Sequence, residues 1–178
     1  MDLVTAARAG CEAAFLELFD EHRLPLFRFA YRMTGSVADA EDIVQECFLE
    51  LLRPGSAYDP AITPVRTYLF GVVRNQSFKR LGKGVTDRQG KDEPSSEGSP
   101  ESHVLRIEMA EVVARAVVNL PGGLREVLVL AHYEQLAIAE IARVLELEST
   151  TVKSRLQRAR AQLRESLAAY ATGMERRR

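Results

Sequence analysis

The chain is poor in the residues that commonly build metal or redox centres. It has no tryptophan, two cysteines and three histidines among 178 residues. His22, His103 and His132 lack a cysteine or carboxylate at ligand spacing, so the sequence predicts no metal and no cofactor. Cys11 and Cys47 cannot make a disulfide framework, and we expect both to be buried as small apolar side chains.

Long apolar runs and a signal sequence are also missing. No run approaches the ~20 residues of a membrane-spanning helix, and the first residues lack the basic and then apolar order of a signal peptide. We therefore expect a cytoplasmic protein without membrane insertion. No nucleophile, base and ligand set converges in the pattern, which argues against an enzyme such as a helical hydrolase.

The net charge of −1 hides an asymmetry along the chain. Up to residue 80 the acidic residues slightly outnumber the basic ones. Residues 149–178 instead hold eight basic and two acidic residues, a difference of +6. A positive field concentrated in one terminal segment favours a polyanionic partner such as nucleic acid.

Helical periodicity without strand-type alternation predicts an all-α protein of two small helical domains joined by a flexible linker. The domains are expected at 1–81 and 104–178. Between them, residues 82–103 are rich in glycine, serine, proline and charge, which predicts disorder or induced order. Helices are expected at 12–34 with a break or bend near Pro25, and at 37–52, 64–81, 104–120 and 121–134.

The C-terminal segment 136–167 has the pattern of a helix-turn-helix. A first helix is expected at 137–145, followed by a short break whose central Leu147 can fill the corner between two helices. Ser149 stands where an N-cap belongs, because its hydroxyl can accept a bond from a free N–H at the helix start.

The second helix of this motif has one apolar and one polar face. The expected buried stripe is Val152, Leu156, Ala159 and Leu163. The polar face suits a DNA major groove, because it combines base-reading side chains with guanidinium groups at its edges. An alternative is an amphipathic helix with a solvated basic face. The DNA-binding candidates are Thr150, Thr151, Lys153, Ser154, Arg155, Gln157, Arg158 and Arg160.

A second amphipathic helix is expected at 37–52, and its outward face is rich in acidic residues. Its expected inward residues are Ala40, Ile43, Val44, Cys47, Phe48 and Leu51. Its expected outward residues are Asp39, Glu41, Asp42, Gln45, Glu46 and Glu50. Acids in a first helical turn also match the helix dipole, so Asp39, Glu41 and Asp42 have a structural explanation that needs no partner.

Two runs in this sequence resemble segments of one known family. YRMTGSVADAEDIVQECFLELL, residues 31–52, resembles the core-polymerase-binding segment of bacterial sigma-70 family sigma factors, in particular the extracytoplasmic-function (ECF) group. VKSRLQRARAQLRESL, residues 152–167, resembles the second helix of that family's C-terminal domain. Both occur in the family's order, with a linker in the family's place.

The resemblance implies a role for each part of the chain. Residues 1–81 would form a region 2-like domain that binds core polymerase and recognises and melts the −10 element, and 104–178 a region 4-like domain for the −35 element. The implied core-binding residues are Asp39, Glu41, Asp42, Gln45 and Glu46. The implied −10 residues are Tyr58, Arg66, Tyr68, Arg74, Asn75, Lys79 and Arg80. Asn75 would read a captured base, because an amide matches a Watson–Crick edge, and the basic side chains would hold phosphates.

The function implied is that of a sigma factor, which directs the RNA polymerase core to a promoter subset and promotes strand opening. Its partners would be RNA polymerase core, promoter DNA and an anti-sigma factor, and the free domains could close on each other. An alternative is a helix-turn-helix regulator with an N-terminal sensory or dimerisation domain. That alternative leaves the acidic helix and the Asn75 segment unexplained.

Several positions depart from the family pattern. Tyr68 stands where the family usually has tryptophan, and the residues 63–65 replace a usual Gly-Ser-Phe. Glu146 replaces the usual glycine of the C-terminal turn, which removes the most permissive residue from it. Gly122 and Gly123 replace a polar helix start, so we expect that helix end to fray.

Overall fold

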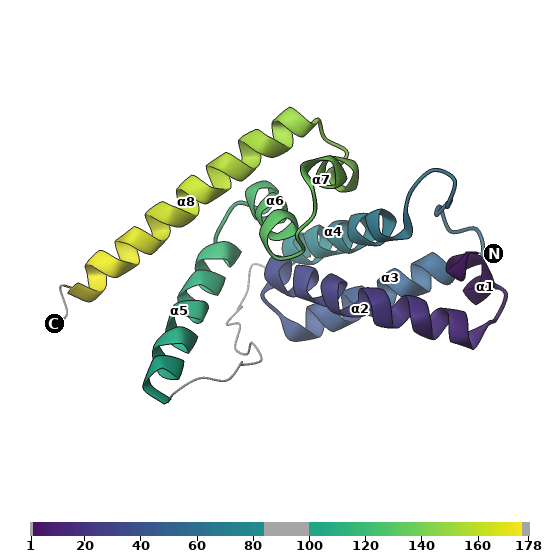
Figure 1. Ribbon diagram of the computed structural model, residues 1–178, viewed down its shortest axis with the longest axis horizontal. Helices are drawn as coiled ribbons and strands as arrows, with labels where there is room; N and C mark the ends of the chain where they lie inside the picture. The colour runs from purple at the N-terminus through teal and green to yellow at the C-terminus, as the bar shows by residue number, and fades with distance from the viewer. Residues whose placement is uncertain (1, 84–99, 176–178) are drawn as a thin grey trace.

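The computed structural model describes residues 2–83 and 100–175, and within them every regular element is helical (Figure 1). The fold-class prediction is therefore confirmed. The helices are α1 (Leu3–Arg8), α2 (Glu12–Thr34), α3 (Val37–Leu52), α4 (Val65–Lys83), α5 (Pro100–Val118), α6 (Gly122–His132), α7 (Ile138–Leu145) and α8 (Ser149–Glu175). None of these helices is long and apolar enough to cross a membrane.

The N-terminal part is built from α2, α3 and α4, with the short α1 packed on α2 and α3 (Figure 1). Gly35 ends α2 in the left-handed conformation, at φ 71°, and the Ser36 side chain accepts a hydrogen bond from the Asp39 N–H to start α3. This stop and start explain why α3 has the predicted bounds. Its predicted inward face is also confirmed: Ala40, Ile43, Val44, Cys47, Phe48 and Leu51 are all buried.

The N-terminal part departs from two expectations. The helix α2 is not broken at Pro25, because buried side chains on both sides of the proline, among them Leu18 and Leu26, hold it against the core; a bend there, the other alternative, stays a prediction. Cys11 is exposed at the turn before α2, whereas Cys47 is buried as expected. Burial raises the pKa of the Cys47 thiol far above its usual range, so this thiol stays protonated.

The C-terminal part consists of α5 to α8, with α8 lying along the outside of α6 and α7 (Figure 1). One continuous apolar core runs through both parts of the chain. The helices α4 and α5 extend into the predicted linker, to Lys83 and from Pro100. The predicted disorder of the remaining linker, 84–99, lies outside the described residues.

The turn between α7 and α8 forms although it lacks a glycine. Glu146 takes the left-handed conformation, with φ 54° and ψ 45°, and the Leu147 N–H donates to the Ala142 carbonyl at 2.9 Å. Leu147 packs against the core, as predicted for the corner. Ser149, however, is the first residue of α8 rather than its N-cap.

The start of α6 is shaped by the two glycines. No side-chain bond caps it at Pro121, and the expected fraying of this helix end stays a prediction. A Cβ atom at Gly122 would lie 2.6 Å from Cε1 of Phe78 on α4. Gly122 therefore allows a close approach between α6 and the N-terminal part, a role that the sequence did not indicate.

The strained turn leads to a prediction about stability. Replacing Glu146 with glycine should raise the free energy of unfolding by about 1 kcal/mol, because a left-handed residue with a Cβ atom is strained and glycine is not. Urea unfolding followed by circular dichroism measures this change. As a control, glycine at the exposed Ala139 within α7 should lower stability by about the same amount. No gain for Glu146→Gly would show that the turn is relaxed without glycine.

Candidate polymerase and nucleic-acid interfaces

The acidic candidates on α3 form one surface patch with an arginine from α4. Glu41, Asp42, Gln45 and Glu46 are exposed, and Asp39 is half-buried. Arg80 reaches across from α4 and pairs with three of the four carboxylates. Its Nη1 lies 3.1 Å from Asp39 Oδ1 and 3.4 Å from Asp42 Oδ2, and its Nη2 lies 2.9 Å from Glu46 Oε1.

This pairing changes the reading of Arg80. It was expected among the phosphate contacts of the −10 segment, which stays a prediction, and in the chain without DNA it pairs with the acidic patch. Four carboxylates and one guanidinium leave a net charge of −3 on this surface (−4 + 1). The patch thus remains suited to a basic partner surface, with Arg80 holding three of its acids close together.

Tyr58 cannot present its ring to a base in this arrangement. Its side chain is only 7% exposed, and its ring centroid lies 5.2 Å from that of the half-buried Tyr68. Burial raises the pKa of the Tyr58 hydroxyl, and the nearby Asp2 carboxylate adds to this effect. Without DNA, the −10 candidate Tyr58 is thus part of the core, packed on Tyr68, and its contact with the −10 element stays a prediction.

Two other −10 candidates lie free on the surface of α4. Asn75 and Lys79 are four residues apart, so they lie on one helix face, and both are exposed. The Asn75 Oδ1 accepts a long hydrogen bond, 3.4 Å, from Nη1 of its neighbour Arg74. The Asn75 amide group remains accessible beside a cationic side chain, the combination that reading an unpaired base requires.

A buried carboxylate joins the two parts of the chain. Glu126 on α6 is 1% exposed, and its Oε2 lies 2.6 Å from Nε of Arg74 on α4. Its Oε1 lies 3.2 Å from Nη1 of Arg155 on α8. One acid therefore holds one candidate DNA contact from each half.

Glu134, at the same interface, binds one arginine through its carboxylate and a −10 candidate through its backbone carbonyl. Glu134 is buried, and its Oε2 lies 3.0 Å from Nη2 of Arg28 on α2. Arg66, a −10 candidate, donates to the Glu134 backbone carbonyl at 3.1 Å. Burial raises the pKa of Glu134, although the bond from Arg28 opposes this shift.

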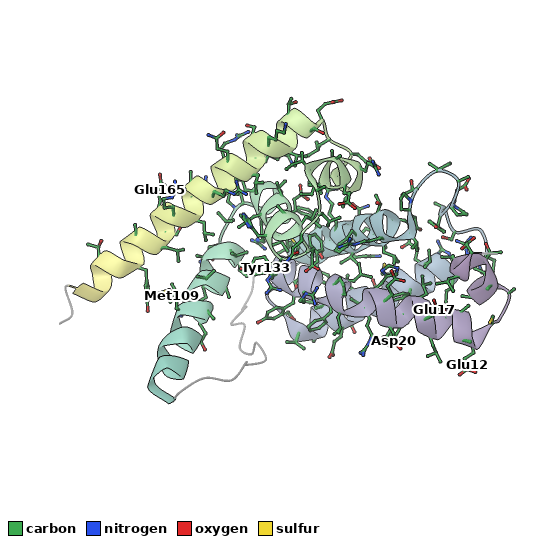
Figure 2. The ribbon with its side chains drawn as sticks, viewed as in Figure 1. Glu12, Glu17, Asp20, Met109, Tyr133 and Glu165 are labelled. Carbon is green, nitrogen blue, oxygen red and sulfur yellow. The ribbon has the colours of Figure 1, made fainter. Side chains whose placement is uncertain are left out.

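Arg125 and Tyr133 complete the interface. The Arg125 guanidinium is buried and donates to the backbone carbonyls of Met33, Val118 and Leu120. Tyr133 is labelled in Figure 2 where the two parts meet. The guanidinium carbon of Arg32 lies over the Tyr133 ring, 3.8 Å from the ring centroid. The sequence reading missed these residues. The available signal was the pair of charges, Arg125 and Glu126, inside an otherwise apolar helix.

The expected DNA face of α8 is open over most of its length. Lys153, Ser154, Gln157 and Arg158 are all exposed, and Ser154 Oγ accepts a bond from Arg158 Nη2 at 3.3 Å. On the other side of α8, Val152, Leu156 and Ala159 are buried and Leu163 is half-buried, which confirms the predicted stripe. The candidate Thr150 is exposed and Thr151 is half-buried.

The two flanking arginines of α8 differ in their surroundings. Arg155 is half-buried against Glu126, whereas Arg160 is exposed. The Arg160 Nε donates to Nε2 of His132 at the end of α6, at 3.1 Å. Within the described part of the chain, no group of three or more histidine, cysteine, aspartate or glutamate residues is placed to hold a metal ion.

Family comparisons match both halves of the chain. The model described as Sigma-70 region 2 matches residues 18–84, and that described as Sigma-70, region 4 matches residues 110–163. The chain is 33% identical over 174 residues to the ECF RNA polymerase sigma factor SigL of Mycobacterium tuberculosis, covering 94% of this chain and 96% of SigL. It is 28% identical over 177 residues to SigW of Bacillus subtilis, covering 92% and 94% respectively.

Solved structures share the arrangement. CnrH, in complex with the cytosolic domain of CnrY, has a TM-score of 0.73 at 29% identity, covering 94% of this chain and 96% of CnrH. RpoE of Bartonella quintana, in complex with the anti-sigma factor NepR, shares the fold with a TM-score of 0.69 at 21% identity, covering 86% of this chain and 96% of RpoE. The matches cover both halves, so a regulator with an unrelated N-terminal domain is not favoured. The chain belongs to the ECF group of the sigma-70 family, whose members are RNA polymerase sigma factors that act in transcription initiation and are not themselves enzymes.

Proposed function

We propose that this sigma factor binds core polymerase through the acidic patch on α3 and reads its promoter with two separate surfaces. Residues 1–81 would engage core and the −10 element, residues 104–178 the −35 element, and residues 82–103 would link them. The observation that carries this assignment is the exposure of two polar faces on different helices. Asn75 and Lys79 are exposed on α4, and the face that contains Gln157 and Arg158 is exposed on α8.

We also propose that the two parts separate when the protein binds polymerase and promoter. Arg74 and Arg155 share Glu126, and Arg66 is held at Glu134, so these guanidiniums are committed to the interface. A phosphate can bind these arginines fully only if the Glu126 carboxylate releases Arg74 and Arg155 and the Glu134 backbone carbonyl releases Arg66. Polymerase would supply energy for separation by offering each part its own site, and joint binding then gains from effective concentration.

The expected partners are core RNA polymerase, promoter DNA and an anti-sigma factor, in the bacterial cytoplasm where polymerase and DNA reside. The relatives are named as RNA polymerase sigma factors, which supports the first two. For the third, the structural neighbours CnrH and RpoE were each solved with a protein partner, in RpoE an anti-sigma factor. An inhibitor of this kind would act by holding the candidate surfaces away from polymerase or DNA.

Promoter-directed transcription with purified core polymerase tests the proposal. Adding the chain should produce transcripts from a promoter subset that core alone does not use. The double variant Asp42→Lys/Glu46→Lys should bind core at least tenfold more weakly, because it reverses two charges of the acidic patch beside Arg80. Its helicity should change little, because exposed charge changes usually cost under ~0.5 kcal/mol of stability.

A matched pair on α2 controls for charge reversal as such. Glu17 and Glu21 are exposed and have the same spacing as Asp42 and Glu46. Reversing them should leave core binding within about twofold of wild type, since distant surface charges are screened. Equal loss of binding in both double variants, or none in either, would remove the α3 patch from the core contact.

The positions of two arginines on α8 lead to distinct expected effects. Arg158→Ala should lose a base contact worth ~1–3 kcal/mol and relax preference at one or two −35 positions. Arg160→Ala should weaken all duplexes similarly and reduce the salt slope by about one unit, because it contacts phosphate. Titrating both variants against a small set of −35 duplexes at several salt concentrations distinguishes them. If Arg158→Ala weakens every duplex by one factor, α8 is rotated in the groove relative to this assignment.

Removing the charge of Glu126 should favour separation of the two parts. Glu126→Gln keeps the volume but loses the ion pairs with Arg74 and Arg155. The free chain should then bind a −35 duplex about three- to tenfold more tightly, because a larger fraction is open and Arg155 is released. Energy transfer between dyes at the exposed Cys11 and at a Glu165→Cys substitution on α8 reports the opening, and the buried Cys47 stays unlabelled.

The control is Glu111→Gln, which removes the charge of an exposed acid on α5. It should change neither the energy transfer nor the duplex affinity. Wild-type energy transfer and affinity in Glu126→Gln would show that this carboxylate does not hold the closed arrangement.

A further inference from the structure

We propose that the short N-terminal helix α1 takes part in promoter opening, because Arg8 holds the loop between α3 and α4 in one conformation. Arg8 is a positioning residue in this proposal and does not contact DNA. The inference rests on the proposed function of residues 1–81, in which α4 engages the −10 element. It concerns a helix outside the region 2 match, which begins at residue 18.

The loop, residues 53–64, depends on one anchor. All of its residues are described, and Tyr58 is the one whose side chain is buried. Two turns flank this anchor: the Ser56 N–H donates to the Arg53 carbonyl at 3.0 Å, and the Thr63 N–H donates to the Asp59 carbonyl at 3.1 Å. The second turn exposes 80% of Ile62. The position of a surface loop with a single buried side chain depends on how that side chain packs, because the other loop residues make few buried contacts.

Arg8 contacts both the anchor and the helix that leads into the loop. Its Nε and Nη2 donate to the Leu51 carbonyl, at 3.0 and 2.8 Å. Its guanidinium carbon lies 5.7 Å from the centroid of the Tyr58 ring. The last carbonyls of a helix lack partners within it and favour a cation. Because α3 has no basic residue in its own last turn, the cation comes from α1.

The anchor is in turn joined to the helix that carries the DNA candidates. Tyr58 packs against Tyr68 of α4, whose hydroxyl lies 3.3 Å from Ser56 Oγ in the loop. Tyr68 and Asn75 are seven residues apart, so they share one side of α4. A displaced loop would therefore change this side of α4 about two turns from Asn75, along the surface where the captured base is proposed to lie.

The helix α1 is itself held in place, which a positioning element requires. Asp2 Oδ1 accepts hydrogen bonds from the N–H groups of Val4 and Thr5, at 2.8 and 3.1 Å, and caps the helix. Val4 is buried in the core. Arg8 thus starts from a fixed backbone, and its contacts cost less conformational entropy than those of a free tail.

The test compares Arg8→Ala and Arg8→Lys with Arg23→Ala. Arg23 lies 5.7 Å from the Phe19 ring on α2, so its removal deletes an arginine–ring contact of the same length in the same part of the chain, away from the loop. Three quantities are measured: core affinity, permanganate reactivity of the −10 strand in the complete polymerase complex, and thermolysin cleavage of the free chain at the Ala61–Ile62 bond. Thermal unfolding checks that each variant is folded.

Arg8→Ala should open the promoter about fivefold more slowly and be cleaved about fivefold faster, as expected for lost hydrogen bonds at a loop anchor. Its core affinity should stay within about twofold of wild type. Arg8→Lys keeps the charge but has one donor nitrogen in place of the guanidinium fork, so it should recover part of both losses. Arg23→Ala should match wild type in all three measurements.

Promoter opening by Arg8→Ala at the wild-type rate would overturn the inference. So would a loss of opening that is matched by an equal loss of core affinity, or that Arg23→Ala shares, since either would indicate general destabilisation. A wild-type chain that cannot open the promoter with core would overturn the proposed function instead, and this is seen before any variant is compared.

Discussion

The pairing of one buried acid with two arginines ties together helices of both helical parts, across an apolar core that the parts share. Glu126 is almost fully buried. Burying a charged carboxylate costs free energy unless cations pair with it and hydrogen bonds satisfy its oxygens. Arg74 and Arg155 meet that need from opposite sides, so α4, α6 and α8 must lie together whenever Glu126 is buried. Buried ion pairs of this type contribute little net stability, but removing one partner leaves an uncompensated buried charge and is costly. An interface of this kind is suited to being exchanged for other partners.

The same constraint explains why much of the site could not be read from the sequence. The ion pairs join Arg74 with Glu126 and Arg28 with Glu134, which are 52 and 106 positions apart. No local periodicity encodes such pairs. What periodicity does encode is which side of a helix is apolar, and the inward face of α3 and the buried stripe of α8 were predicted from it correctly.

The presence or absence of a local sequence signal explains which parts of the fold could be predicted. The bounds of α3 were predictable because a glycine in the left-handed conformation and a capping serine stand directly before it. The helix α1 has six residues, fewer than two turns, which is too short to show a period. The expectations of a break at Pro25 and of a buried Cys11 failed because both depend on tertiary packing. Packing decides whether Pro25 interrupts a helix and whether Cys11 is buried, and the neighbouring residues in the sequence do not show this.

Gly122 shows that a missing side chain can be as informative as a charge. The space that a single methyl group would need is occupied by the Phe78 ring. A side chain at this position therefore acts as a wedge between α6 and α4, and it would also displace the ring over which the Arg74 guanidinium lies, at 5.3 Å from the ring centroid. In evolutionary terms, the proposed balance between a closed and an open chain is accessible through single-codon changes that leave the exposed candidates Asn75, Gln157 and Arg158 as they are. Related chains could thus differ in their need for an inhibitor while they retain the same promoter-reading side chains.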